Sequence, residues 1–308
     1  DRGEHDCSAA RASDGRHVVA GDTRAGETRR EVWVRLTFSP VAFAAVLALL
    51  AWHQRLGSSA PTDLVLALLA GAAAHEVAQM LRRAGHQAVP VVTVAFSAAL
   101  AGLGLAIPDD PAGRGTARAL LLAAAVLAAF LPHLRAAREG DLERLSATLF
   151  PVVYVGFLLG LLRELGDGPA GAGRIALVVV ASKMSDAGGW LVWTTIGRHR
   201  MLPSVSPGKT WEGTLGGLAF AAATAAGWVA LLGPVPGLAG TPAAAAAFGI
   251  VVGVASLLAG LTNSALKRRC GVKHASPLLP GIGGVLDVVD SLLLAGPAAW
   301  AWSLAWGA

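Results

Sequence analysis

Residues 241–291 read TPAAAAAFGIVVGVASLLAGLTNSALKRRCGVKHASPLLPGIGGVLDVVDS. The apolar run 241–261 is about as long as a helix needs to cross roughly 30 Å of hydrocarbon. The segment after it carries Lys and Arg side chains, a Gly/Pro-rich turn and two carboxylates. Ionisable groups next to lipid require a water-filled site or charged partners. The stretch therefore predicts a membrane-spanning helix that leads directly into a polar site.

The composition extends this interpretation to the whole chain. Of 308 residues, 54% are apolar and 15% are charged, and the mean hydropathy is +0.58. These values exceed what a soluble core of this size requires. Apolar windows of spanning length lie near 37–53, 62–81, 88–107, 116–134, 146–162, 174–196, 214–233, 241–261 and 284–306. We predict an all-α, polytopic integral membrane protein with about nine transmembrane helices.

The cations in the loops predict an orientation, because Lys and Arg concentrate in short cytoplasmic loops. One set of alternate loops holds most of them: Arg24, Arg29, Arg30, Arg35, Arg82, Arg83, Arg135, Arg138, Arg144, Arg198, Arg200, Lys209, Lys267, Arg268, Arg269 and Lys273. The other set holds Arg55, Arg114, Arg118, Arg163 and Arg174. We therefore expect a multi-pass protein of the cell (inner) membrane. Its N-terminus and the loops 197–213 and 262–283 should face the cytoplasm, and its C-terminus should lie outside.

The chain divides into two unequal parts. Residues 1–36 are polar, show no apolar periodicity and do not begin with Met. We expect them to be a disordered or spurious leader rather than a domain. Residues 37–308 should form one membrane-embedded domain.

A second polar segment, residues 182–213, reads SKMSDAGGWLVWTTIGRHRMLPSVSPGKTWEG. Lys183 and Asp186 stand three residues apart in an apolar span, so they share one helical face, either as part of an interior site or as an ion pair that neutralises itself. In Ser206–Thr210, glycine permits close approach to a phosphate, Lys209 supplies a cation and the hydroxyls can donate hydrogen bonds. The segment lacks P-loop spacing, and we predict no strand before it.

These two segments together resemble the phosphatidate cytidylyltransferases, also called CDP-diacylglycerol synthases. The first block matches at Ser185-Asp186-Ala187-Gly188-Gly189-Trp190, Gly197-Arg198-His199 and Ser206-Pro207-Gly208-Lys209-Thr210-Trp211-Glu212-Gly213. The second block matches at Ser264, Lys267, Arg268, Lys273, Pro280-Gly281, Gly283-Gly284, Asp287 and Asp290. His75-Glu76 resembles the family's early intramembrane acid. The resemblance covers roughly residues 40–306, with both blocks in order at family spacing.

The chain also departs from the family pattern. Gly260 and Asn263 stand where the family usually carries an Asp and a Glu, so two acidic groups are missing. His274, Ile282 and Val288 replace a family Asp, His and Arg. The missing acid at position 260 puts a metal ligand in doubt.

The resemblance implies that phosphatidate attacks CTP to give CDP-diacylglycerol and pyrophosphate. Catalytic roles would fall to Asp186, Ser206, Lys209, Thr210, Glu212, Lys267, Arg268 and Asp287. Substrate binding would involve Arg198, Ser264, Lys273, Gly283 and Gly284. Asp287 and Asp290 lie three apart at the start of the last helix, where they can either ligate Mg²⁺ or cap the helix. We expect Mg²⁺, with a monovalent cation as a further candidate, and a homodimer is what the resemblance implies.

Several other functions stay open at this point. A catalytically impaired relative would keep a structural or lipid-binding role, and a nearer variant would use CTP on another membrane lipid. A transporter or channel would explain the buried charges, but it would not explain the SPGKTWEG loop. The expected partners are CTP, phosphatidate and the bilayer, and no nucleic acid.

Overall fold

The computed structural model describes residues 44–46, 48–108, 110–131, 140–278 and 283–306. The predicted leader 1–36 lies outside these residues, as do Arg135, Arg138, Pro280, Gly281 and Ile282. Helices make up nearly all of the described chain, and the only strands in it form one short hairpin. The prediction of an all-α polytopic membrane protein is confirmed.

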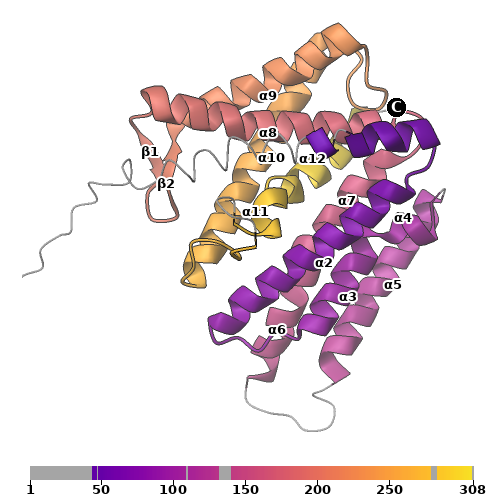
Figure 1. Cartoon of the computed structure of the whole chain (residues 1–308), viewed down its shortest axis with the longest axis vertical. Coiled ribbons are helices and arrows are strands. Elements are labelled where there is room, and N and C mark those ends of the chain that lie inside the picture. The colour runs from indigo at the N-terminus through magenta and orange to yellow at the C-terminus, as the bar shows by residue number, and fades with distance from the viewer. Residues whose placement is uncertain (1–43, 47, 109, 132–139, 279–282, 307–308) are drawn as a thin grey trace, which may run out of the picture.

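The first half of the chain forms a bundle of helices (Figure 1). Residues 48–56 are helical. The elements that follow are α2 (Ala60–Arg83), α3 (Pro90–Ala101), α4 (Leu103–Ala106), α5 (Pro111–Phe130), α6 (Asp141–Pro151), the π-helical turn η2 (Val152–Phe157), α7 (Leu158–Arg163) and the 3-10 turn η3 (Glu164–Gly166). Pro151 lacks the backbone N–H that an α-helix would use, and the hydrogen-bond pattern loosens directly after it.

The second half carries the polar segments. Its elements are α8 (Gly171–Ile196), β1 (Arg200–Leu202), β2 (Ser206–Thr210), α9 (Trp211–Leu232), α10 (Pro242–Arg269), α11 (Val285–Val289) and α12 (Leu292–Trp306). In Figure 1, α8 and α9 run side by side, and the hairpin projects from their end. The α10 helix packs on α9 and α12, and α11 packs on α2, so the last span joins the two halves.

Within the described residues, seven helical segments are long and apolar enough to cross a membrane. They correspond to seven of the nine predicted spans. The predicted span 88–107 consists instead of α3 and the single turn α4, which meet at Gly102. A side chain at Gly102 would lie 2.8 Å from the Ala67 methyl group, so close packing against α2 fixes this break. The predicted span 37–53 lies largely outside the described residues.

Three cations that the sequence suggested as loop charges lie instead in a buried ionic network. Its members come from α2, α5, α7 and the turn after α7: Asp63, Arg114, Arg118, Arg163, Glu164 and Asp167. The Arg118 Nη2 to Glu164 Oε1 distance is 2.7 Å, and the Arg163 Nη1 to Asp167 Oδ1 distance is 2.8 Å. Arg163 also pairs with the fully buried Asp63. The three guanidinium charges are thus balanced by three carboxylates, and these ion pairs join α2, α5 and α7 at this end of the bundle.

Candidate active site

The β1–β2 hairpin places Ser206–Thr210 beside the helices α8, α9 and α10. The strands are antiparallel, with Arg200 opposite Thr210 and Leu202 opposite Ser206. The segment that we expected to be a loop without a preceding strand is therefore itself a strand, β2. Thr210 ends it as the N-cap of α9, and its Oγ1 accepts a hydrogen bond from Gly213 N at 3.0 Å. This cap aims Lys209 at a fixed position beside the first turn of α9.

Glu212 fixes the base of the hairpin. Its carboxylate accepts hydrogen bonds from the backbone N–H groups of Arg198 and His199, and it pairs with the His199 ring at 2.5 Å. These contacts hold the turn after α8 against α9. The Arg198 side chain is exposed, and it lines neither of the two cavities described below.

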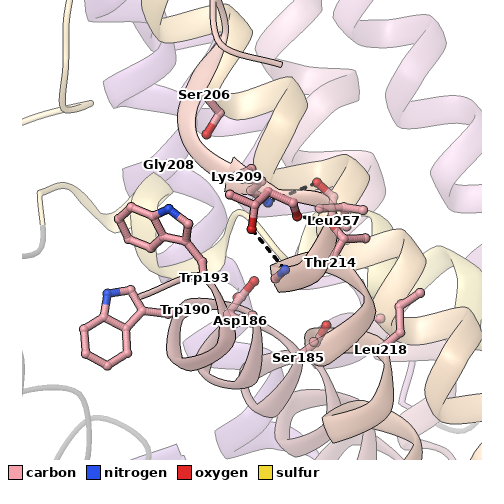
Figure 2. A pocket seen from close by; sticks show the side chains of 15 residues that line it. Ser185, Asp186, Trp190, Trp193, Ser206, Gly208, Lys209, Thr214, Leu218 and Leu257 are labelled. Carbon is pink, nitrogen blue, oxygen red and sulfur yellow. Dashed lines mark hydrogen bonds between the residues drawn. The ribbon is translucent and has the colours of Figure 1, made fainter. Parts of the chain in front are cut away.

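A cavity of about 270 Å³ lies between β2 and the helices α8, α9 and α10. Figure 2 shows Asp186 and Ser185 rising from α8 below Lys209, with Trp190 and Trp193 at one side. Trp190 is 54% exposed, so this side of the cavity opens toward the outer surface of the helices. The cavity thus combines a charged floor with an exposed aromatic edge.

Lys209 is the charged group that reaches α10. Its Nζ donates to Leu257 O at 3.4 Å, and a Cβ atom at Gly260 would lie 3.0 Å from the same Nζ. Burial lowers the pKa of Lys209, and the nearby carboxylates of Asp186 and Asp290 oppose that shift. The ammonium therefore lies beside Gly260, where the resemblance led us to expect an acid.

A second cavity, of about 290 Å³, lies on the other side of β2. Ser206 lines both cavities, so the hairpin forms the wall between them. The lining of the second cavity is strongly polar: Val205, Ser206, Pro207, Ser264, Lys267, Arg268, Lys273, His274, Asp287 and Asp290. Five predicted cation or hydroxyl donors and both predicted metal ligands thus meet in one place. A group of this composition can hold a polyphosphate.

Asp287 is the most heavily hydrogen-bonded carboxylate in this cavity. Its Oδ1 accepts from Lys267 Nζ at 2.6 Å and from Asn263 Nδ2 at 3.4 Å. Its Oδ2 accepts from Ala275 N at 3.2 Å and from Gly284 N at 3.1 Å. The side chain therefore caps α11, which was one of the two roles that we considered for it. A cation that bound here would take over Oδ1 from Lys267.

Asn263 brings Asp287 and Asp290 together. Its Nδ2 lies 3.4 Å from Asp287 Oδ1 and 3.0 Å from Asp290 Oδ2, so one amide bridges both carboxylates. The Asn263 Oδ1 atom is buried without a hydrogen-bond partner. In the described part of the chain no cluster of three or more His, Cys, Asp or Glu side chains is arranged to hold a metal. Two converging carboxylates suit Mg²⁺, which takes few protein carboxylates and completes its octahedron with phosphates and water.

Glu76 organises the turn that leads into α11, a role that the sequence did not reveal. Its Oε1 accepts from Ser276 Oγ at 2.6 Å and Val285 N at 3.0 Å, and its Oε2 accepts from Leu286 N at 2.8 Å. A side chain at Gly284 would collide with this carboxylate, which explains the need for glycine there. The α2 helix thus fixes the start of α11 from 200 residues away in the chain.

Lys183 holds the break between α11 and α12. Its Nζ donates to Val288 O at 2.8 Å and to Ser291 Oγ at 3.0 Å. Lys183, one member of the pair that we considered self-neutralising, thus contacts the last span. The sequence offered one signal for this arrangement, an ionisable pair inside an apolar helix.

Comparison with known proteins matches residues 33–305 to the cytidylyltransferase family. A phosphatidate cytidylyltransferase of Pseudomonas aeruginosa is 35% identical over 233 residues, which cover 70% of this chain and 79% of that protein. Phosphatidate cytidylyltransferases of Mycobacterium bovis and Brucella melitensis are 34% and 37% identical over 160 and 150 residues. These matches cover 52% and 49% of this chain, and 50% and 53% of those relatives. The chain thus spans about half the length of several curated relatives that it matches. Because the family match covers nearly the whole described fold, the chain belongs to the cytidylyltransferase family.

Proposed function

We propose that this protein transfers CMP from CTP to phosphatidate, giving CDP-diacylglycerol and pyrophosphate. The observation that carries the proposal is the pair of adjoining cavities that share Ser206 in their common wall. One cavity is lined by cations and carboxylates, and the other has an aromatic edge at the outer surface of the helices. This pair of cavities suits a reaction between a water-soluble polyphosphate and a phosphate group carried by a lipid.

In the proposed reaction, a phosphate oxygen of phosphatidate attacks the α-phosphorus of CTP. A new P–O bond joins the two phosphates, the bond between the α-phosphorus and the bridging oxygen breaks, and pyrophosphate leaves with that oxygen. The attacking phosphate is already ionised near neutral pH, so no general base is needed. Because both reactants are anionic, the protein must supply cations and hold them in line.

The residues of the second cavity would bind the nucleotide phosphates. Lys267, Arg268 and Lys273 would neutralise phosphate oxygens, and Ser206 and Ser264 would donate hydrogen bonds. Asp287 and Asp290 would hold Mg²⁺ in place of the Asn263 amide N–H group that now bridges their carboxylates. When bound, this ion would neutralise charge on the leaving phosphate oxygens.

Lys209 would act at the junction of the two cavities. It interacts with Asp186 in the first cavity and with Asp290 in the second. A cation at this place can contact both the lipid phosphate and the α-phosphate. We also propose that the hairpin and the end of α10 face the cytoplasm, where CTP is available, and that the protein functions as a homodimer in the cell membrane.

The position of the label in CTP tests this reaction. Purified protein in detergent is supplied with phosphatidate, Mg²⁺ and CTP labelled at either the α- or the γ-phosphate. The proposal predicts lipid-soluble label from α-labelled CTP alone, and only when phosphatidate is present. If neither form of labelled CTP gives lipid-soluble label, or if γ-labelled CTP does, the result would contradict the proposed transfer. Replacing phosphatidate by a polyprenyl phosphate distinguishes the same chemistry on another lipid.

One observation favours a second candidate, a catalytically impaired family member. The Lys209 ammonium lies against Gly260, where the resemblance leads us to expect an acid. Without this acid, the site has one fewer group to position Lys209 or a cation. A large gain in turnover in the variant Gly260→Asp, together with Asn263→Glu, would favour impaired chemistry. Full activity in the wild type would exclude it.

A further inference from the structure

A third cavity lies outside the candidate active site, where α2 ends and α3 begins. Its volume is about 410 Å³, and it is lined by Arg82, Gly85, His86, Gln87, Ala88, Val89, Pro90 and Arg144. None of these residues lines either of the other two cavities. The proposed reaction gives this cavity no role.

Two guanidinium groups in this cavity have no acidic partner among the residues that the structure describes. Within the described part of the chain, neither Arg82 nor Arg144 forms an ion pair, whereas Arg163, at the opposite end of α2, pairs with Asp63 and Asp167. The Nε of Arg144 is buried and has no hydrogen-bond partner. A buried donor left without an acceptor is costly, so most such groups in native proteins have a partner. The two arginines therefore present unused donors to one cavity.

The frame around these arginines is held in place. The His86 ring pairs with Glu143 in the first turn of α6, so this carboxylate already has a partner. Val89 N donates to Thr148 Oγ1 at 3.1 Å, which ties the start of α3 to α6 a second time. The α3 helix begins at Pro90, and the first N–H groups of a helix lack partners within it. These groups add partial positive charge to the same wall.

The cavity lies at the ends of two helices that are long and apolar enough to span a membrane. Arg82 is in the last turn of the span Ala60–Arg83, and Arg144 is in the first turn of the span Asp141–Gly166. Arginine binds phosphate through two parallel hydrogen bonds, and basic pockets between transmembrane helices bind phosphorylated headgroups. We propose that this cavity binds a phosphate group, from either an anionic lipid or free phosphate. This inference does not depend on the proposed reaction.

Thermal unfolding of the intact protein in neutral detergent tests the proposal. Three additions are compared, which are inorganic phosphate, phosphatidylglycerol in mixed micelles, and phosphatidylcholine at the same mole fraction. The wild type is compared with Arg82→Gln/Arg144→Gln and with Arg83→Gln. Arg83 is the matched control, because it is adjacent to Arg82 and exposed but does not line the cavity.

We expect phosphate or phosphatidylglycerol to raise the melting temperature of the wild type and of Arg83→Gln in a saturable way. In the double variant the apparent affinity should fall about tenfold or more, as the loss of charged hydrogen bonds predicts. A response to phosphatidylglycerol alone assigns the site to a lipid headgroup, and a response to both additions assigns it to any phosphate. An equal response in the wild type and the double variant would overturn the proposal. If the double variant does not fold, Arg82→Gln alone serves the same comparison, because Arg82 is exposed.

Discussion

Replacing Asn263 by glutamate should destabilise the protein when no divalent cation is present. The Asn263 amide now donates to both Asp287 and Asp290, at 3.4 and 3.0 Å, and the residue is fully buried. A glutamate at this place cannot donate, and it adds a third negative charge to the pair. Asn263→Leu provides the matched control, because it removes the two hydrogen bonds without adding a charge.

The expected magnitude follows from these contacts. A hydrogen bond to a charged group contributes about 1.5–3 kcal/mol, and the bond to Asp287 is long, so the combined loss of both bonds in Asn263→Leu should cost about 3 kcal/mol. Glutamate adds repulsion of about 4 kcal/mol for each carboxylate at a separation of about 4 Å, with an effective dielectric constant of about 20. At roughly 2–4 °C per kcal/mol, Asn263→Leu should melt about 6–12 °C below the wild type. Asn263→Glu should melt lower still.

The assay is thermal unfolding in detergent with EDTA and, separately, with excess Mg²⁺. Mg²⁺ should restore much of the stability of Asn263→Glu, because a cation can bridge three carboxylates. It should change Asn263→Leu by no more than it changes the wild type. If Asn263→Glu is as stable as the wild type in EDTA, Asn263 does not hold the two carboxylates together, and the reasoning is refuted.

Three further predictions concern Lys209, Arg163 and Glu76. Burial lowers the pKa of Lys209, so its ammonium should lose its proton at a lower pH than an exposed lysine. As the pH rises, kcat/KM should then fall at a pH below about 10.4, the usual pKa of lysine, and Lys209→Arg should move this fall to higher pH. Arg163→Met leaves Asp63 buried without its partner and should lower the free energy of unfolding by about 3–5 kcal/mol. Adding Asp63→Asn to Arg163→Met should recover part of this loss. Equal melting temperatures for the single and the double variant would contradict the role of the network. Glu76→Gln loses charged hydrogen bonds to the start of α11, so it should speed hydrogen exchange at residues 285–287 and lower kcat. An unchanged exchange rate would count against the capping of α11 by Glu76.

The membrane spans were predictable because each depends on a local property of the sequence. Apolar runs such as 241–261 show their length and composition directly, and the helices follow them. The break at Gly102 was not predictable. It depends on the approach of α2 to the end of α3, and no local pattern reports this contact.

The candidate site was predictable as two groups of residues but not as an arrangement. Family spacing selected Lys267, Asp287 and Asp290, and the structure brings them to one cavity. The capping of α11 by Glu76 joins positions about 200 residues apart, so it could not be deduced from spacing. The strand conformation of Ser206–Thr210 depends on its pairing with Arg200–Leu202. The Pro and Gly residues in this segment are rare in strands, so its sequence did not predict one.

The buried ionic network shows that Lys and Arg residues assigned to loops from the sequence do not all lie in loops. Arg114, Arg118 and Arg163 resembled loop cations on the side with few positive charges, yet all three are buried among carboxylates. Their partners come from other helices, so only the fold shows that these charges are neutralised. Asp63 in this network and Glu76 are thirteen residues apart in α2, about 20 Å along the helix. The network therefore lies far from the candidate site and serves stability.

The central claim is that the end of α10 and the start of α11 form a site for CMP transfer. The most direct measurement is the formation of labelled CDP-diacylglycerol from α-labelled CTP and phosphatidate by the wild type, Lys267→Met and Arg269→Gln. Lys267 lines the polar cavity and pairs with Asp287, whereas Arg269 lies two residues further along the same helix and lines neither active-site cavity. We predict robust product from the wild type and Arg269→Gln, and a loss of at least about 100-fold in Lys267→Met. No product from the wild type, or equal rates for all three proteins, would contradict the account.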